Sequence, residues 1–531
     1  MVIKILLLAV FFAVTIFVGL YFRKRAASVN DFVLGGRAVG PWLSAFSYGA
    51  TYFSAVVFVG YAGQFGWRFG NAAIWIGLGN AFIGSLLAWI VLGRRTRVMT
   101  NHLKSATMPA FFGTRYVSQA LKIGASIIVF IFLIPYTASL YNGLSRLFEM
   151  AFGVPFVYCI IAMGILTAIF VVAGGYIATA VNDFIQGAIQ LVGIVAVVVV
   201  AINSKGGLFN AIESLSKVSD EAAGISAGGF TSLFGPDPVS LIGVFILTSL
   251  GTWGLPQMVA RFYSIKSEKM IGKGAVVSTF FSLFVAGGCY LLGSFGRLWT
   301  DSDSLVKDAA GNFIKLGDLS PMKFDEIIPA VLSGMGEVMI GVVVVLVFAA
   351  SISTLSSLVM ASASTLTLDF LKGHIIKNMS DKKQLLIIRA LIVVFIIISS
   401  SIAIMQVSGT FSGNLAFIAQ LMGVSWGALA GSFLAPFLYG LYWKKTSRIS
   451  VWCCFIFSTG LMLSYIVLNT VFNKFFVENV PKILQSPINL GAIAMLAGLV
   501  IVPLVSLFTK APQKEHVTDC FSCFDKNQVT Q

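Results

Sequence analysis

The chain has 531 residues, of which 57% are hydrophobic and only 11% are charged, and its mean hydropathy is +0.92. So few charged groups cannot cover so much apolar surface in water, so the composition excludes an ordinary globular domain and indicates one large domain in a lipid bilayer. The net charge of +15 would suggest a nucleic-acid partner for a soluble protein, but in a membrane protein basic residues also mark cytoplasmic connections.

Thirteen apolar segments are long enough to cross a bilayer core about 30 Å thick. The first is followed by Arg23, Lys24 and Arg25 without a small-residue cleavage site, so we expect an anchor and not a signal peptide. The sequence therefore predicts an all-α membrane protein with 13 transmembrane helices. The segments begin near residues 2, 41, 72, 119, 153, 178, 238, 275, 333, 384, 414, 450 and 488.

Two of these segments carry helix breakers at membrane depth. The segment from residue 41 contains Gly49, and the segment from residue 238 contains Gly251, Gly254 and Pro256. Such residues weaken the helical hydrogen-bond ladder, and carbonyls freed in a membrane need a protein partner or a wet cavity. An ordinary kink is the alternative. Because the two segments lie five apart, they favour an inverted repeat of two five-helix halves, each opened by a broken helix, around a central site.

This repeat predicts the domain organisation. We expect a first helix and loop, a first repeat, an outer loop, a second repeat with its own outer loop, two peripheral helices and a cytoplasmic tail. The corresponding ranges are 1–40, 41–202, 203–237, 238–445 with loop 298–332, 446–509 and 510–531.

Basic residues cluster in alternate connections, and Lys and Arg near helix ends stay on the cytoplasmic side. Acidic residues gather instead in the connections 203–237 and 298–332. We expect the N-terminus outside and the C-terminus in the cytoplasm of a cell-membrane protein, and topology then explains the basic excess without nucleic acid. The basic clusters are Arg23–Arg25, Arg94–Arg97, Arg261–Lys273, Lys372–Lys383 and Lys444–Arg448.

Hydroxyl side chains are unusually dense in one apolar segment. Residues 349–368 read AASISTLSSLVMASASTLTL, with nine Ser or Thr in twenty positions. Ala350, Ser353, Thr354 and Ser357 follow the spacing i, i+3, i+4, i+7, so they share one helix face, with Ser356 alongside. Such hydroxyls can bond back to carbonyls one turn earlier, but beside a broken helix they can also supply oxygen ligands for a monovalent cation.

Asp183 is an acidic residue at the start of the segment from residue 178. An anion there suits either the N-terminus of a helix or a cation site, and the sequence leaves both open.

Several motifs of other protein classes are missing. The chain has no HExxH or GxxxxGK[ST] sequence, which argues against an enzyme, and no TVGYG filter, which argues against a channel. Cys520 and Cys523 form a lone CxxC pair near the C-terminus, for which we expect a flexible tail without a metal.

Six sequence runs together resemble the sodium:solute symporter family, over residues from about 30 to 445. That resemblance implies a leucine-transporter-like fold of ten core helices in two inverted repeats, here with one extra helix before and two after. It also implies transport and not catalysis. The runs are FVLGGRAVGPW, GATYFSA, GGYIATAVNDFIQG, GLPQMVARF, SISTLSS and LAPFLYGLYWKK.

The resemblance also implies ion sites and a co-transported sodium ion, one or two per solute. The common sodium site would use the carbonyls of Ala50, Phe53 and Ala350 and the hydroxyls of Ser353 and Thr354. A second site would use Asp183, Ser353, Ser356 and Ser357.

Family members line or close their solute pocket at positions that match Tyr52, Ser54, Tyr136, Trp253 and Gln257. At Tyr52 this chain departs from the proline symporters, which carry aspartate, and from the sugar symporters, which carry asparagine. We expect a monomeric sodium symporter that imports a small carboxylate-bearing solute, such as proline, pantothenate or a monocarboxylate. A sodium/sugar symporter and a transport-deficient solute sensor are the alternatives.

Overall fold

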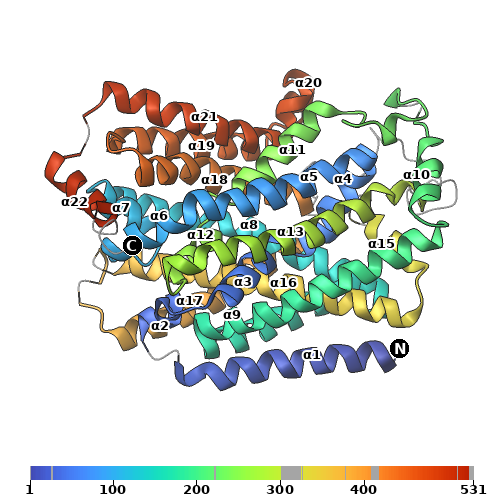
Figure 1. Ribbon diagram of the computed structural model, residues 1–531, viewed down its shortest axis with the longest axis horizontal. Helices are drawn as coiled ribbons and strands as arrows, with labels where there is room; N and C mark the ends of the chain where they lie inside the picture. The colour runs from blue at the N-terminus through green and yellow to red at the C-terminus, as the bar shows by residue number, and fades with distance from the viewer. Residues whose placement is uncertain are drawn as a thin grey trace.

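The computed structural model is almost entirely helical, and the helices run roughly parallel to its long axis (Figure 1). It describes residues 2–25, 28–220, 223–299, 325, 327–372, 374–376, 378–407, 418–510 and 512–525. Most of the predicted outer loop 298–332, with Asp301, Asp303 and Asp308, therefore lies outside the described residues, as do Lys377 and the start of the segment predicted from residue 414.

Within the described residues, eleven helical stretches are long and apolar enough to cross a membrane. Two are composite: Val56–His102, which includes α4 (Ala62–Phe69), α5 (Ile74–Gly79) and α6 (Arg94–His102), and Pro238–Ser264, which includes α11 (Pro238–Gly251) and α12 (Pro256–Ser264). The others contain α1 (Val2–Tyr21), α8 (Gln119–Phe152), α9 (Phe156–Ser204), α13 (Ile271–Ser294), α16 (Glu337–Thr365), α17 (Asp381–Val407), α18 (Ile418–Tyr442), α19 (Arg448–Thr470) and α21 (Pro487–Phe508).

Shorter helices connect these stretches or cap their ends. They are α2 (Val29–Leu34), α3 (Pro41–Tyr52), α7 (Met108–Arg115), α10 (Leu208–Ser216), α15 (Ile327–Ser333), α20 (Asn473–Asn479) and α22 (Lys514–Asp525).

The count of eleven differs from the expected thirteen because two stretches each run across an expected connection. In the stretch 56–102, Gly70 has φ 59° and ψ −139°, and in α9 Gly175 has φ 58° and ψ −158°. Both glycines hold backbone angles that side chains with a Cβ rarely adopt. Gly175 divides α9 into two helical segments, 156–174 and 176–204, and the helix expected from residue 41 is split at its centre.

Replacing Gly70 by alanine is expected to destabilise the fold strongly, for two reasons. The new Cβ would lie 2.1 Å from the carbonyl oxygen of Phe230, and alanine would be strained at the positive φ of this position. Gly153 is a matched control, because it also has a positive φ, 65°, but nothing lies within 4 Å of its Cβ position. We expect the melting temperature of the detergent-solubilised protein to fall by several degrees more for Gly70→Ala than for Gly153→Ala. Equal melting temperatures would contradict the close approach at Gly70.

Both predicted breaks are present. The α3 helix ends at Tyr52, Phe53 is extended with φ −104° and ψ 105°, and a wide helical turn resumes at Val56. The second break separates α11 from α12 at residues 252–255, where Leu255 is extended and Pro256 begins α12. An ordinary kink would keep the helix continuous, so these segments are truly interrupted.

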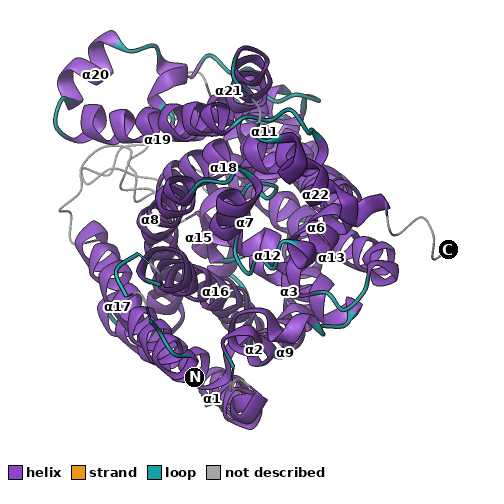
Figure 2. Cartoon of the chain, turned by 90° about the vertical axis from the view of Figure 1, so that its left-hand side faces the viewer, coloured by secondary structure: helices purple, strands orange, loops and turns teal. Residues whose placement is uncertain are grey.

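Viewed along the helices, α16 lies near the middle of the bundle (Figure 2). It packs against α3, α8 and α9, while α19 and α21 pack on α18 at one margin. The stripe of hydroxyls on α16 is consequently enclosed by protein and does not face lipid.

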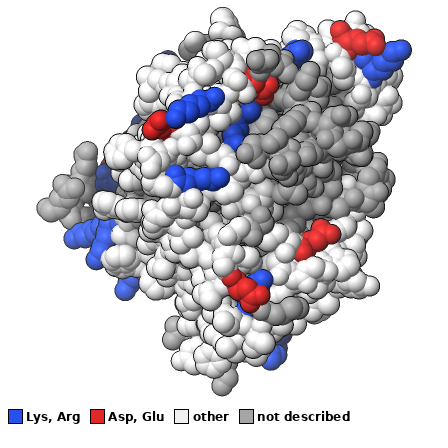
Figure 3. Space-filling view, turned by 90° about the vertical axis from the view of Figure 1, so that its right-hand side faces the viewer, with Lys and Arg blue, Asp and Glu red and all other residues white. Residues whose placement is uncertain are grey.

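Charged groups at the end of the molecule that carries α10 occur largely as neighbours of opposite sign on a mostly uncharged surface (Figure 3). Two of the ion pairs in this part of the chain are Arg68 with Asp237, 2.9 Å apart, and Lys217 with Glu213, 2.7 Å apart. The two termini lie at opposite ends of the long axis (Figure 1).

The C-terminal segment is not the flexible tail that we expected. It forms α22, which lies against α6 (Figure 2) and buries Val517, Cys520 and Phe521. His516 Nε2 lies 2.9 Å from the carbonyl oxygen of Thr114, and the Arg115 guanidinium lies 5.1 Å from the Phe521 ring. Burial raises the pKa of the Cys523 thiol to about 11, so the docked thiol is protonated at neutral pH.

Candidate sodium and solute site

The break after α3 faces the hydroxyl stripe of α16. Because α3 ends at Tyr52, its last carbonyls have no partner within the helix. The carbonyl of Gly49 accepts a hydrogen bond from the Phe53 N–H. Thr354 Oγ1 lies 3.3 Å from the carbonyl oxygen of Ala50 and 3.0 Å from that of Thr51.

The same hydroxyl lies 3.1 Å from the carbonyl oxygen of Ala350, one turn earlier in α16. Thr354 thus stands among three carbonyl oxygens but has one proton to donate. A set of oxygens with more acceptors than protons is suited to a hard cation. The back-bond expected for ordinary helix packing is present as well, so the geometry of this hydroxyl is compatible with both of the roles that the sequence left open.

Ser353 points to a different partner. Its hydroxyl donates to Asp183 Oδ1 at 2.6 Å, and the hydroxyl of Ser47 donates to Asp183 Oδ2. Asp183 is fully buried and lies two turns after Tyr176, the first residue beyond the break in α9. The helix-cap alternative for Asp183 is therefore wrong, because a cap stands at the first turn of its helix.

Arg261 completes this cluster, and the sequence did not reveal it. Its Nη2 lies 3.2 Å from Asp183 Oδ2 and 2.8 Å from Thr51 Oγ1, and it also donates to Ser357. We expected Arg261 to belong to a basic cytoplasmic cluster, but it is 2% exposed. A guanidinium at this depth needs a carboxylate partner, and Asp183 supplies it.

The remaining predicted ion ligands lie nearby. The Ser356 and Ser357 hydroxyls donate to the carbonyl of Ser353 at 2.8 and 3.1 Å. Phe53 is buried, and its extended backbone turns its carbonyl out of the helical ladder. The structure therefore brings Ala50, Ala350 and Thr354 into direct contact, while Ser353 and Ser357 belong to the Asp183–Arg261 cluster.

Two of the predicted solute residues form an aromatic group with Trp426. The Tyr52 ring stacks on Phe53 and lies 6.2 Å from the Trp426 ring, against which Tyr136 packs edge-on at 5.9 Å. The Tyr52 hydroxyl donates to the carbonyl of Thr248 at 2.5 Å. Trp253 donates to the carbonyl of Ile83 at 3.0 Å, so these aromatic groups are already engaged.

Ser54 faces a small cavity beside the candidate sodium half-site, which consists of Thr354 Oγ1 and the three carbonyl oxygens around it. Phe53, Ala350 and Gln190 also line it. Both amide atoms of Gln190 are buried and have no hydrogen-bond partner among the described residues. Gln190 is a candidate that the sequence did not reveal, since nothing in a single sequence distinguishes it from Gln186, one turn earlier in α9.

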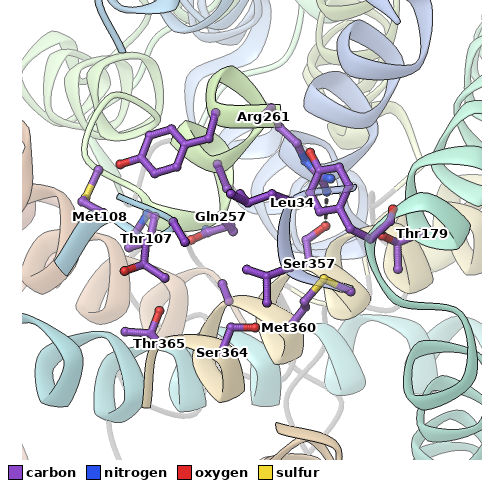
Figure 4. A pocket seen from close by; sticks show the side chains of 17 residues that line it. Leu34, Thr107, Met108, Thr179, Gln257, Arg261, Ser357, Met360, Ser364 and Thr365 are labelled. Atoms are coloured by element: carbon purple, nitrogen blue, oxygen red, sulfur yellow. Dashed lines mark hydrogen bonds between the residues drawn. The ribbon is translucent and has the colours of Figure 1, made fainter. Parts of the chain in front are cut away.

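Gln257 lies apart from this group and faces a second, larger cavity (Figure 4). The cavity begins at Arg261 and Ser357 and extends along α16 to Thr365. Four of the five predicted solute residues are therefore divided among an aromatic group and two cavities, and Trp253 lies apart from all three.

Comparisons with known proteins identify the family of this chain. A model of the sodium:solute symporter family matches residues 32–456. The osmoregulated proline transporter OpuE of Bacillus subtilis is 27% identical over 514 residues, covering 96% of each chain, and a sodium/proline symporter of Staphylococcus aureus is 29% identical over 83% of this chain and 82% of its own. Both are transporters.

The structure is similar to a substrate-bound, outward-open Na⁺-coupled sialic acid symporter, with a TM-score of 0.72 and 18% sequence identity over 96% of this chain and 99% of that one. This likeness supports the fold. The family match extends over most of the chain and includes the broken α3, the α16 hydroxyls and Asp183. The chain belongs to the sodium:solute symporter family.

Proposed function

We propose that this multi-pass membrane protein couples the inward movement of sodium to uptake of a small carboxylate-bearing solute, with proline as the first candidate. The observation that carries the proposal is Thr354 Oγ1 among the carbonyl oxygens of Ala50, Thr51 and Ala350. The relatives named as proline transporters favour proline over a sugar, although Tyr52 stands where proline symporters carry aspartate.

The mechanism follows from linkage between the two sites. Sodium held by Ala50, Phe53, Ala350, Ser353 and Thr354 would fix the broken α3 against α16 and so shape the adjacent cavity at Ser54. Solute binding then raises sodium affinity by the same factor as sodium raises solute affinity. A membrane potential of 100 mV adds about 2.3 kcal/mol for each positive charge that enters.

One sodium ion per solute is the proposed stoichiometry. A second ion at Asp183, Ser353, Ser356 and Ser357 would have to displace Arg261, whose guanidinium already provides the positive charge next to Asp183. We also propose 13 crossings in an inverted five-plus-five repeat, with breaks at Phe53 and Leu255, a functional monomer, an outer N-terminus and a cytoplasmic C-terminus.

Uptake into proteoliposomes tests the function directly. L-[³H]proline, pantothenate, a monocarboxylate and a hexose are offered with an inward sodium gradient or with potassium, and ²²Na⁺ entry is counted in parallel. We expect sodium-dependent proline uptake with one ²²Na⁺ per solute. A ratio of two would support the second ion site, and sodium-independent uptake would refute the coupling.

Gln190 is expected to contact the solute, because its amide lines the cavity beside the sodium half-site and has no hydrogen-bond partner among the described residues. Gln190→Leu should raise the KM for the transported solute about tenfold while leaving the sodium dependence of uptake intact. Gln186→Leu is the control, since this amide is also buried and unpartnered among the described residues but does not line the cavity. Equal KM values for the two variants would remove Gln190 from the site.

A further inference from the structure

The larger cavity is enclosed by α2, α7, α9, α12 and α16, and it starts where the Asp183–Arg261 pair ends (Figure 4). Its far end reaches Thr107 and Thr365, toward the end of the molecule that carries α7 and α22 (Figure 1). It is thus separated from the sodium half-site by the buried ion pair.

Four residues lining this cavity carry a buried polar atom without a hydrogen-bond partner among the described residues. They are Gln257 Oε1, Arg261 Nε, Tyr263 Oη and Ser364 Oγ, and none of these residues is more than 3% exposed. Buried polar groups are normally hydrogen-bonded, and each one left unpaired costs about 1–3 kcal/mol. Four such atoms around one cavity can be satisfied together by a ligand that supplies the missing partners.

The four atoms differ in what they require. Gln257 Oε1 can only accept a hydrogen bond, Arg261 Nε can only donate one, and the hydroxyls of Tyr263 and Ser364 can do either. An ammonium group satisfies the acceptor, and a carboxylate satisfies the donors. The apolar walls of Leu34, Met108 and Met360 (Figure 4) suit a short aliphatic body between these groups.

The charges at the walls are already paired. Arg261 neutralises Asp183, and Asp369, which accepts a hydrogen bond from the lining residue Thr107, lies 3.4 Å from Lys122. A ligand with a net charge would add an unpaired charge to a buried site, whereas a zwitterion adds none. The chemistry therefore favours a small net-neutral zwitterion over a monocarboxylate anion.

We propose that this cavity is a release site, which holds a zwitterionic amino acid between the central site and the cytoplasm. The proposal rests on the proposed transport function and narrows its solute class. The ion pair forms the wall between the two sites, so the solute passes Arg261 before it contacts Gln257, Tyr263 and Ser364.

Two matched pairs of variants test the release site. Ser364→Ala is compared with Ser362→Ala, because both serines are on α16 with buried hydroxyls that have no partner among the described residues, and only Ser364 lines the cavity. Tyr263→Phe is compared with Tyr290→Phe, because both hydroxyls are likewise buried and unpartnered there, and only Tyr263 lines the cavity. KM for L-proline is measured from each face, in inside-out and right-side-out vesicles.

We expect Ser364→Ala and Tyr263→Phe to raise the ratio of the cytoplasmic KM to the external KM about three- to tenfold, with the control variants at the wild-type ratio. Tetrahydrofuran-2-carboxylate, which has the shape of proline without the ammonium group, should compete poorly from the cytoplasmic face.

Unchanged ratios of cytoplasmic to external KM in both cavity variants would overturn the release site. Equal competition by tetrahydrofuran-2-carboxylate and L-proline from the cytoplasmic face would overturn it as well. If the wild-type protein showed no sodium-dependent uptake, the proposed function would be refuted instead. Failure of the release site and failure of the transport function are therefore distinguishable.

Discussion

Replacing Thr354 by valine is expected to raise the sodium concentration for half-maximal uptake at least tenfold. Valine keeps the shape of threonine but removes the one side-chain oxygen that lies among the carbonyls of Ala50, Thr51 and Ala350. Loss of one oxygen ligand of about five in a cation site is worth more than 1.4 kcal/mol, which corresponds to a factor of ten. The measurement is proline uptake into proteoliposomes over a range of sodium concentrations.

Thr367→Val provides the control for this result. Thr367 lies farther along the same helical run, and its one side-chain hydrogen bond among the described residues returns to the carbonyl of Ala363, at 2.8 Å. Its replacement should leave the sodium dependence unchanged. If the two valine variants required the same sodium concentration, Thr354 would be a packing residue.

Asp183→Asn is expected to reduce uptake at least a hundredfold and to lower the melting temperature by several degrees. The substitution removes the only charge that offsets Arg261 within the described hydrogen-bonded cluster of Ser47, Thr51, Asp183, Arg261 and Ser357. An uncompensated buried charge costs about 3–5 kcal/mol. Both measurements use the same purified protein: the melting temperature is measured in detergent, and the uptake rate is measured after reconstitution into liposomes.

A double-mutant cycle separates the charge effect from the loss of a sodium ligand. Asp183→Asn combined with Arg261→Gln removes both charges, so stability should recover toward the wild type. If the double variant recovered its stability but not its transport, the Asp183–Arg261 pair would be needed for sodium-coupled uptake itself. A double variant as unstable as Asp183→Asn alone would contradict the ion pair as the source of the cost.

The fold class, both helix breaks and the hydroxyl stripe could be predicted from the sequence because each has a local signal. Gly49 and Pro256 weaken their own helices, and the spacing of Ser353 and Thr354 sets their face of α16. The number of helical stretches was harder to predict. Gly70 and Gly175 each change the backbone direction inside a stretch that continues as helix on both sides, so one stretch stands where two segments were expected.

The pairing of Arg261 with Asp183 had no local signal. The two residues are 78 positions apart, and Arg261 stands next to a run of basic residues that resembles a cytoplasmic connection. Charge alone does not show whether an arginine is exposed or buried, because that depends on how α9, α12 and α16 pack.

The docked tail, in contrast, had a signal that could have been used. Val517, Cys520, Phe521 and Phe524 follow the spacing i, i+3, i+4, i+7 of an amphipathic helix. Three of these four positions are ordinary apolar residues, and the fourth is a cysteine that packs like one.

The position of α22 makes folding at that end depend on completed synthesis. Its partners α6 and α7 are synthesised about 400 residues earlier, so they can pack against α22 only after the last helix has left the ribosome. A chain that stops before Lys514 leaves the surface around Arg115 uncovered. Full-length and prematurely terminated chains would therefore differ most at this end of the molecule, where α22 packs against α6 and its Phe521 lies over Arg115.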